Sequence, residues 1–469
     1  MSQSIEQVAV QARQAANQLQ NVTSSQKSVV LQRIRQKLQE HKEEIFAANA
    51  QDLKLAQAEV DKGNLSASLF KRLDIKGPNE EKFNTLLQGV TDVDNLPDPI
   101  GQVSRATELD QGLDLYRVSA PVGVILVIFE ARPEVVVNIS CLAIKSSNAA
   151  ILKGGKEAFH TLTALTKVMQ EALHSVRKEI PFPTNAIQLV ATREQISGLL
   201  QQDRYIDLVI PRGSNSLVRH IQNNTRIPVL GHADGICSVF LDDTADPNKA
   251  PGLVVDAKTN YPAACNSAET LLVHRKLLVP GGVLERTIQN LFDNGVSLRC
   301  DAASLDFIRQ NPTLNQAGTY REGEQFAAST PEDYDTEFLD LCMAVRVVDS
   351  LEDAIDHINT HSSKHTDCIV TETAAHAEKF MNMVDAAGVF WNASTRFADG
   401  FRYGFGTEVG VSTNKTHARG PVGLEGLTIY KYRLYGHGHK AGDFGVGAGK
   451  KQYSHHPIPL ETVQGKFVK

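Results

Sequence analysis

The sequence predicts an α/β protein with two doubly wound parallel-sheet domains and an added β element. From residue 122 onward, apolar runs such as VGVILVIF alternate with helical patterns, and a second series of this kind starts near Ile236. Continuous apolar strands separated by helices are typical of parallel strands that are buried on both faces. Near residue 103, and again past Gly410, alternating runs indicate antiparallel strands instead.

Composition and charge exclude several classes of protein. The chain has 469 residues, 42% hydrophobic and 22% charged, which is ordinary for a globular protein of two or three domains. A net charge of -6 without a dense Lys/Arg run speaks against a surface for nucleic acid or anionic membrane. The N-terminus lacks an apolar targeting segment, and the longest apolar stretch is too short for a membrane span. Six cysteines without a CxxC pair suit a reducing compartment. We therefore expect a cytoplasmic protein without disulfides.

The order of the predicted elements is as follows. Residues 1–60 show helical spacing of apolar residues and contain no glycine or proline, so they predict helices. Residues 103–117 predict a hairpin with its turn at Asp110 to Gly112. The strands predicted after it are 122–130, 149–153, 186–191, 205–211, 227–233, 237–243, 271–274, 342–348, 367–372 and 427–436. The Gly/His/Lys-rich tail is expected to be irregular.

A cysteine stands in the plain segment NYPAACNSAET, residues 260–270. On its own, Cys265 has two interpretations, because most lone cysteines are small buried hydrophobes. Its small neighbours Ala263, Ala264 and Ser267 leave the sulfur accessible. A cysteine in a turn that leads into a helix can use backbone N–H groups to stabilise a thiolate and a developing oxyanion. We therefore take Cys265 as a candidate nucleophile at the start of a helix.

Several long segments resemble one known family. They are 120–158, 206–221, 227–242, 256–274, 357–372 and 391–427. Together they resemble the gamma-glutamyl phosphate reductases of the aldehyde dehydrogenase superfamily, in their order and over nearly the whole chain. The tail after Gly426 is similar to that of the eukaryotic, stand-alone form. The resemblance implies an aldehyde dehydrogenase-like fold. It also implies a cofactor-binding domain over 1–102 and 118–235, a catalytic domain over 236–409, and an oligomerisation element and tail over 103–117 and 410–469.

The resemblance assigns chemistry to three residues. Cys265 is the implied nucleophile: its thiolate attacks an acyl phosphate, and the thioester that forms accepts a hydride. Aldehyde-oxidising relatives carry a water-activating Glu in an ELGG motif, where this chain has LGHADG and His232. His232 is then a catalytic or phosphate-binding residue, or a core histidine. Arg132 in FEARPEV falls near the usual oxyanion-hole Asn and either binds phosphate or forms an ordinary ion pair.

The cofactor residues are also implied by the resemblance, since no GxGxxG follows the first strand. Lys153 matches the superfamily Lys after its strand, and Gly213 with Ser214 matches a turn at a helix start. Lys156 stands where NAD-preferring relatives have an acid, so NADPH/NADP is the expected cofactor; otherwise Lys156 only begins an exposed helix. Glu337 resembles the Glu that contacts the nicotinamide ribose, or else is a solvated loop acid.

Substrate and metal sites are less defined. A substrate with an amino and a carboxylate group needs counter-charges and amides, and the segments WNASTRF and HARGP supply them. Asn392 and Thr395 are the candidates for substrate binding. We expect no metal, because four tail histidines (His437, His439, His455 and His456) are typical of a solvated tail. DFGVGAGKKQ lacks the first Gly and the Ser/Thr of a P-loop.

The resulting prediction is NADPH-dependent reduction of L-glutamyl 5-phosphate to L-glutamate 5-semialdehyde and phosphate, in proline biosynthesis. The main alternative is an NAD(P)-dependent aldehyde dehydrogenase, against which the missing upstream Glu argues. A third possibility is a non-catalytic relative that has a structural or binding role. We also expect a homo-oligomer, because the long edge strands need partners, and glutamate 5-kinase is a candidate functional partner.

Overall fold

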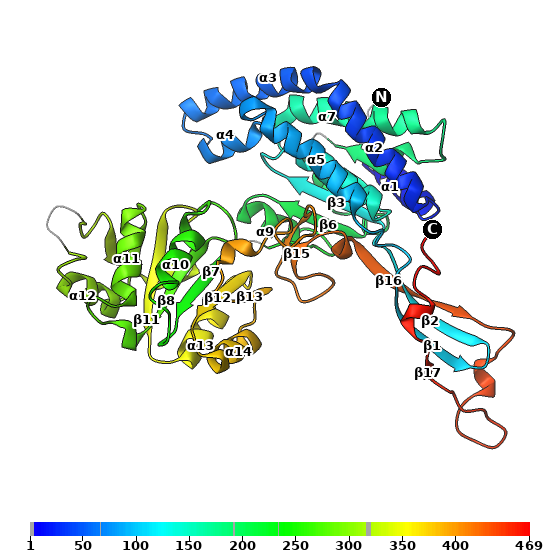
Figure 1. The fold of residues 1–469 in the computed structure, drawn as a ribbon. Coiled ribbons are helices and arrows are strands. Elements are labelled where there is room, and N and C mark those ends of the chain that lie inside the picture. Colours follow the sequence, from blue (N-terminus) through cyan, green and yellow to red (C-terminus); the bar gives the residue numbers. More distant parts are fainter. Residues whose placement is uncertain (1–3, 66, 191–192, 233, 316–319) are drawn as a thin grey trace. The chain divides into compact units, whose positions relative to one another are not determined.

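The computed structural model describes residues 4–469 except 66, 191–192, 233 and 316–319. The chain forms two compact units (Figure 1). The first unit comprises 1–230, 405–410 and 422–469, and the second comprises 231–404 and 411–421. These units do not assign roles, so the division into cofactor-binding, catalytic and oligomerisation parts stays a prediction.

The first unit contains a four-stranded parallel sheet in the order β5-β4-β3-β6. Its strands are β3 (Val124–Phe129), β4 (Ala149–Lys153), β5 (Ile187–Leu189) and β6 (Leu208–Arg212). The chain adds β4 and β5 on one side of β3 and then returns to place β6 on the other side. The carboxyl ends of β4 and β6 therefore flank the end of β3, at a topological switch point. The strand predicted at 227–233 was wrong: Val229 makes only a single bridge to Val209, and Ala233 lies outside the described residues.

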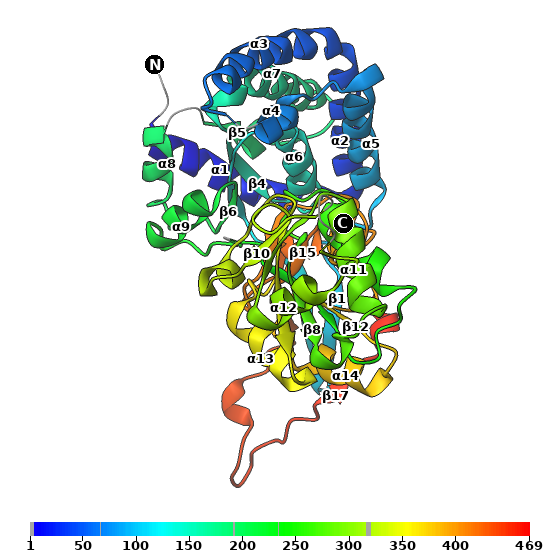
Figure 2. The ribbon, with the colours of Figure 1, turned by 90° about the vertical axis from the view of Figure 1, so that its left-hand side faces the viewer.

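Helices cover this sheet (Figure 2). They are α1 (Ile5–Leu19), α2 (Ser24–Glu40), α3 (Lys42–Asp61), α4 (Ala67–Leu73), α5 (Glu81–Asn95), α6 (Val135–Lys145), α7 (Phe159–Val176), α8 (Arg193–Leu199) and α9 (Asn215–Asn223). The predicted helices over 1–60 are thus confirmed. Capping boxes begin the first two, Ser4 with Gln7 and Thr23 with Gln26, because each side chain satisfies a backbone N–H that the first turn leaves open. Among the described residues, no helix is both long and apolar enough to cross a bilayer.

The second unit contains a seven-stranded parallel sheet in the order β10-β9-β11-β8-β7-β12-β13. Its strands are β7 (Cys237–Leu241), β8 (Ala268–His274), β9 (Ser297–Cys300), β10 (Phe326–Ala328), β11 (Cys342–Val348), β12 (Thr366–Val370) and β13 (Gly388–Trp391). Its helices are α10 (Ala250–Thr259), α11 (Val283–Asp293), α12 (Ala302–Gln310), α13 (Leu351–His361) and α14 (Ala374–Met383). The four strands predicted here are confirmed, whereas β9, β10 and β13 were missed because they are short.

Alternate side chains of this sheet enter two separate cores. Leu271 and Val273 pack with α10, α11 and α12, whereas Leu272 between them packs with α13 and α14. Both cores consist of buried apolar side chains, and each fully buried aliphatic side chain contributes about 1.5–3 kcal/mol. The continuous apolar runs of the sequence therefore reflect helices on both faces, as a doubly wound sheet requires.

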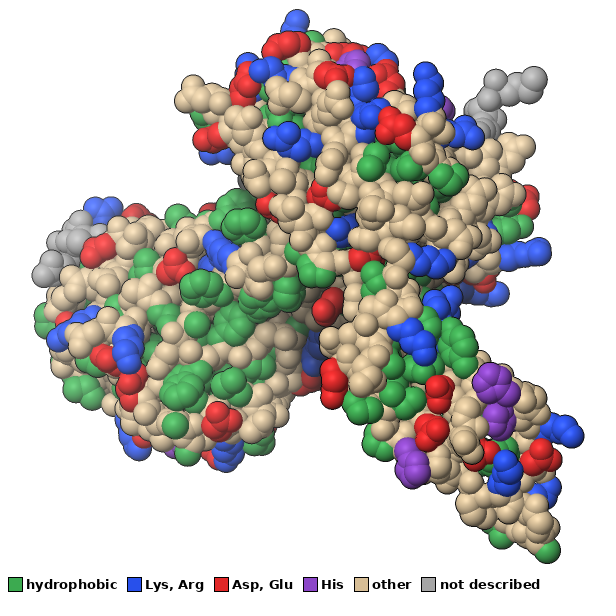
Figure 3. Space-filling model, turned by 45° about the vertical axis from the view of Figure 1, so that its right-hand side comes forward, with side chains coloured by type: hydrophobic (Ala, Val, Ile, Leu, Met, Phe, Trp, Pro, Cys, Tyr) green, Lys and Arg blue, Asp and Glu red, His purple; other side chains and the backbone are tan. Residues whose placement is uncertain are grey.

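An antiparallel sheet in the order β16-β2-β1-β17 completes the first unit. Its strands are β1 (Val103–Asp110), β2 (Leu113–Pro121), β16 (Thr428–Tyr435) and β17 (His456–Pro457), and a separate pair is formed by β14 (Gly410–Ser412) and β15 (Gly420–Val422). The predicted hairpin is confirmed, with Gly112 at a φ of 74° in its turn. The tail is less irregular than predicted, since Phe467 packs edge-on against Tyr116 in a small core. Apolar side chains and histidines show on this sheet in Figure 3.

A buried ion pair closes the base of the loop that carries Cys265. Lys258 ends α10 and Glu269 lies in β8, so the two residues flank the loop. Lys258 Nζ donates to Glu269 Oε2 at 2.6 Å, and both side chains have an exposed fraction of 0%. Burial raises the pKa of Glu269 to about 7, against the attraction of the Lys258 ammonium. The pair joins the two ends of the loop.

Replacing Lys258 by Met should destabilise the second unit by roughly 3–5 kcal/mol at pH 8, because a buried carboxylate would lose its counter-charge. The loss should shrink as the pH falls from 8 to about 6, because removal of the Lys258 ammonium raises the pKa of Glu269 further and its protonation in the folded state removes the charge. Urea titrations followed by circular dichroism at both pH values measure this. The double variant Lys258→Met/Glu269→Leu is the control, and it should recover most of the loss. A double variant as unstable as the single one would contradict the argument.

Candidate active site

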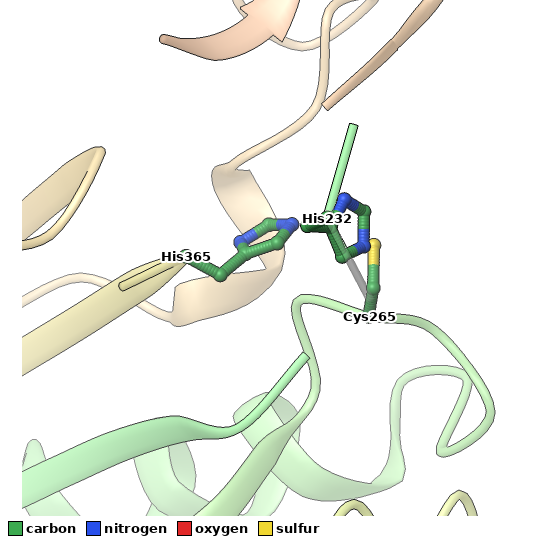
Figure 4. A group of neighbouring side chains, drawn as sticks. All are labelled: His232, Cys265 and His365. Carbon is green, nitrogen blue, oxygen red and sulfur yellow. The ribbon is translucent and has the colours of Figure 1, made fainter. Parts of the chain in front are cut away.

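Three side chains from separate parts of the sequence meet at one edge of the second unit's sheet. His232 precedes β7, Cys265 precedes β8 and His365 directly precedes β12, and these three strands are neighbours in the order β8-β7-β12. Since the strands are parallel, the loops that enter them lie at the same, amino-terminal edge. One ring nitrogen of each histidine and Cys265 Sγ all lie within 4.8 Å of one another (Figure 4). The sheet order thus assembles a Cys-His-His cluster.

Both imidazole rings are held by hydrogen bonds through Nδ1. His232 Nδ1 lies 2.9 Å from the carbonyl oxygen of Val411, and His365 Nδ1 lies 3.0 Å from Thr366 Oγ1. The rings meet edge to face, with centroids 5.0 Å apart. His365 is 1% exposed and its Nε2 has no hydrogen-bond partner, whereas Cys265 and His232 are only half-buried. Cys265 and His232 are therefore partly exposed, while His365 is buried.

The Cys265 backbone lies directly against Gly235. A Cβ added to Gly235 would stand 2.1 Å from the Cys265 carbonyl oxygen and 2.5 Å from its Cα, so no side chain fits there. On the other side, Asn266 Nδ2 donates to the carbonyl of Ala398 at 2.9 Å. Glycine at 235 and asparagine at 266 thus set the position of the loop.

The predicted helix after Cys265 is wrong. The chain turns through Ser267 and enters strand β8 at Ala268, so the segment after Cys265 supplies no helix N-terminus. The physical reason is that AETLLVH is buried at every position and pairs with strands on both sides, so it forms a central strand of the sheet. Stabilisation of the thiolate must come from side chains instead.

The electrostatics of Cys265 differ from those of the other buried thiols. Burial raises the pKa of Cys300 and of Cys368 to about 12, and it raises that of Cys237 as well. For Cys265, burial also acts to raise the pKa, but His365 and His232 outweigh it and hold the pKa well below its usual range. Two imidazoles therefore favour the thiolate, which is the nucleophilic form of cysteine.

Glu337 interacts electrostatically with Cys265 and His232 of this cluster. Burial raises its pKa to about 7, with a further upward contribution from Cys265 and an opposing one from the backbone amide of Gly235. It is half-buried rather than fully solvated. A contact with a nicotinamide ribose stays a prediction for this residue.

The substrate candidates are divided between the two edges of the sheet. Thr395 is fully buried in the short turn Thr395–Phe397, and the next residue, Arg396, is 9% exposed and interacts electrostatically with Cys265. Asn392 instead follows β13 at the carboxyl-terminal edge, where its side chain bonds to the backbone of Thr371. Arg396 is therefore within electrostatic range of Cys265, and a substrate-binding role for Asn392 and Thr395 stays a prediction.

Apart from Glu337, the candidate cofactor residues lie in the first unit. Lys153 ends β4, and Gly213 with Ser214 follows β6, so they flank the end of β3. A Cβ on Gly213 would meet the Glu130 carboxylate at 2.5 Å, and the Ser214 N–H donates to that carboxylate at 2.9 Å. The N-terminus of α9 thus already attracts an anionic oxygen.

Two other predicted residues lie near this edge. Lys156 is exposed at the start of a short turn after β4. Arg132 follows β3 and acts on Glu134, whose pKa is raised by burial despite this guanidinium. The role of Arg132 in phosphate binding stays a prediction.

Comparison with known proteins establishes the family. Residues 1–291 match the model of the aldehyde dehydrogenase family. A probable gamma-glutamyl phosphate reductase of Schizosaccharomyces pombe is 50% identical over 460 residues, 98% of each chain, and that of Saccharomyces cerevisiae is 50% identical over 466 residues, 98% of this chain and 99% of that one. The crystal structure of gamma-glutamyl phosphate reductase from Thermotoga maritima is 34% identical, with a TM-score of 0.84 over 93% of this chain and 100% of that one. The chain belongs to the aldehyde dehydrogenase family, in its gamma-glutamyl phosphate reductase branch. The predicted fold and family are confirmed, and the chain is an oxidoreductase.

Within this family, the cluster contains residues that sequence reasoning missed. His365 stands in the segment HSSKHTDCIVTE, and only the proximity of β12 to β7 reveals that it reaches Cys265. Gly235 ends the LGHADG stretch, in which only His232 was predicted to be functional. A glycine shortly before a predicted strand was the one available signal, since glycine allows a close backbone approach.

Replacing Gly235 by Ala should displace the Cys265 loop and lower stability by roughly 1–3 kcal/mol, because the added Cβ meets backbone atoms. Alkylation of Cys265 by iodoacetamide, followed by mass spectrometry, should change in rate. Gly252→Ala in α10 is the matched control, since nothing lies within 4 Å of a Cβ there. Equal behaviour of the two variants would show that the contact at Gly235 does not position the nucleophile.

Proposed function

We propose that the chain reduces L-glutamyl 5-phosphate to L-glutamate 5-semialdehyde and inorganic phosphate, with NADPH as the reductant and Cys265 as the nucleophile, in proline biosynthesis. The observation that carries the proposal is the position of Cys265 between His232 and His365. An imidazole with its Nδ1 on a carbonyl stands where aldehyde-oxidising relatives carry a water-activating carboxylate. The names and high identity of the full-length relatives support the substrate.

The chemistry proceeds through a thioester on Cys265. The thiolate attacks the acyl carbon, the carbonyl oxygen becomes an oxyanion, and the C–O bond to phosphate breaks with its electron pair leaving on phosphate. His365 presents its unpartnered Nε2 to this point and donates to the oxyanion. The nicotinamide, when bound, supplies the hydride. The thiohemiacetal then collapses to the aldehyde and returns the thiolate, which the two imidazoles stabilise.

The substrate's far end requires a cation, and Arg396 supplies it. Its guanidinium is almost buried, and its Nε has no hydrogen-bond partner within the chain. A buried guanidinium binds a carboxylate in a two-point arrangement. Thr395 Oγ1 is also buried without a partner and is the second candidate for this end. The aldehyde product carries a free amine that closes on it to form pyrroline-5-carboxylate.

The residues of the first unit fit a dinucleotide. Gly213 leaves room beside the exposed start of α9, and the Ser214 N–H already binds a carboxylate oxygen that a phosphate oxygen would replace. Lys153 and Lys156 place two cations after β4. These residues would hold the phosphates and the ribose, and Lys156 would favour the 2′-phosphate of NADPH.

Lys156→Glu should raise the KM for NADPH by about tenfold or more while changing that for NADH much less, because an ionic hydrogen bond is worth roughly 1.5–3 kcal/mol. Steady-state kinetics with both cofactors measure this. Lys178→Ala, an exposed lysine of the same unit, is the control and should change neither value. An equal effect of Lys156→Glu on both cofactors would contradict the proposed recognition of the 2′-phosphate.

A hydrolytic aldehyde dehydrogenase is the second candidate, and Glu337 is the observation that favours it. This carboxyl lies in the field of Cys265, and with a pKa of about 7 it is suited to act as a base toward water. In that reaction water, not phosphate, would resolve the thioester.

The reverse reaction separates the two functions. NADP+ reduction with pyrroline-5-carboxylate should require inorganic phosphate and should vanish in Cys265→Ala. Cys342→Ala is the control and should retain activity. Turnover without phosphate that is lost in Glu337→Gln would establish the hydrolytic reaction instead.

We also propose a homo-oligomer built through β16. This strand is at the edge of its sheet and exposes Ile429, Tyr430, Tyr432 and Leu434, which is a liability unless another chain covers them. Cytoplasmic location and a functional link to glutamate 5-kinase stay predictions from the sequence and the family resemblance.

A further inference from the structure

The Cys-His-His cluster has the composition of a zinc site. Cys265, His232 and His365 offer one sulfur and two ring nitrogens within 4.8 Å of one another. Thiolate and imidazole are the ligands that Zn²⁺ prefers, and three protein ligands with an open fourth position are typical of an accessible zinc site. A second group of donors in the described part of the chain, Asp242, Asp243 and His376, is already neutralised, because Lys276 donates to Asp243 and His376 pairs with Asp242.

The histidines are oriented as zinc ligands usually are. A carbonyl oxygen can only accept a hydrogen bond, so the contact with Val411 requires a proton on His232 Nδ1, and in the neutral ring the lone pair is then on Nε2. His365 likewise uses Nδ1 toward Thr366, and its Nε2 is buried without a hydrogen-bond partner. Zinc-bound histidines almost always make such a hydrogen bond through the second nitrogen. A ring nitrogen of His232 lies beside the sulfur in Figure 4.

The distances are within reach of a tetrahedral ion. Zn–S and Zn–N bonds of about 2.3 and 2.0 Å place ligand atoms about 3.3–3.6 Å apart. The donors, at up to 4.8 Å, need shifts of about 1 Å or less each to close on the metal. Cys265 and His232 are half-buried, so an ion can enter, and the fourth position stays open to water.

We propose that Zn²⁺ binds Cys265, His232 and His365 and reversibly closes the active site. The sulfur and the two Nε2 atoms each donate a lone pair to the metal, and any protons on these three atoms pass to solvent, so no oxidant or reductant is involved. With its sulfur coordinated, Cys265 cannot attack an acyl carbon or an alkylating reagent. The coordination itself is independent of the proposed function, whereas inhibition of turnover rests on it.

Binding is tested on the full-length protein after treatment with a chelator. Co²⁺, titrated as a spectroscopic probe, should give a tetrahedral spectrum with a thiolate-to-metal charge-transfer band, and Zn²⁺ should displace it at one ion per chain. Cys265→Ser should abolish the charge-transfer band. Thr366→Val, which removes the partner of His365 Nδ1, should weaken binding by about 10–100-fold. His365→Gln should weaken it at least as much.

Two matched variants exclude other donors. Cys342→Ser removes a half-exposed thiol outside the cluster, and His437→Ala/His439→Ala removes two tail imidazoles. Both should bind Co²⁺ as the unmodified chain does. Absence of the charge-transfer band from the unmodified chain, or its persistence in Cys265→Ser, would overturn the proposal.

The functional arm uses two readouts. Zn²⁺ should protect Cys265 from iodoacetamide and inhibit phosphate-dependent NADP+ reduction, and EDTA should reverse both effects. Protection without any reductase turnover in the metal-free enzyme would sustain the zinc site and refute the proposed function. Turnover that Zn²⁺ leaves unchanged, with no protection of Cys265, would refute the zinc site and leave the proposed function standing.

Discussion

Parallel pairing of β8, β7 and β12 is the constraint on which the candidate site depends. Backbone hydrogen bonds set Cys237 opposite Ala268 and Asp367 opposite Ser238, so the loops entering the three strands meet at one edge. The loops are also joined to each other: Asp367 accepts hydrogen bonds from the Ser238 N–H and the Ser362 hydroxyl. A slip in this register would turn the strands' buried side chains to the wrong face and would separate the sulfur from its imidazoles.

The interactions that hold the Cys265 loop fix its position more than they add to the free energy of unfolding. A buried ion pair such as Lys258–Glu269 gains little net free energy, because desolvation of both charges offsets their attraction. Tyr261 at the start of the loop has a φ of 69°, a conformation that costs a non-glycine residue about 1 kcal/mol or more. The packed surroundings, with Gly235 and Asn266 in contact, hold this strained loop in one conformation, and the sulfur stays beside both histidines.

The two units use opposite edges of their sheets. In the first, the candidate cofactor residues lie at the carboxyl ends of β4 and β6, beside a topological switch point and a helix N-terminus. In the second, the nucleophile lies at the amino ends of its strands and is followed by strand β8 rather than by a helix, and two histidines favour its thiolate. The sulfur and the same two histidines are also the ligands that we propose for Zn²⁺. The reactivity of Cys265 and its proposed inhibition by zinc therefore have the same physical origin.

The sequence by itself determined the fold class, the buried strands, the N-terminal helices and the hairpin, because hydrophobic periodicity reports burial on one or two faces. It also pointed to Cys265, His232 and the lysines after β4, since their segments carry recognisable patterns. The short strands β9 and β13 were not predicted, and a helix start was wrongly expected directly after Cys265, because periodicity over a few residues does not distinguish strand from helix.

Only the tertiary structure decided which distant residues meet. The order β8-β7-β12 brings His365 to the sulfur of Cys265, although the two residues are far apart in the sequence. The tertiary structure also shows that Gly235 contacts the Cys265 backbone and that Arg396 interacts electrostatically with Cys265. Strand order and backbone contact depend on long-range pairing, which leaves no local pattern in the residues that it joins.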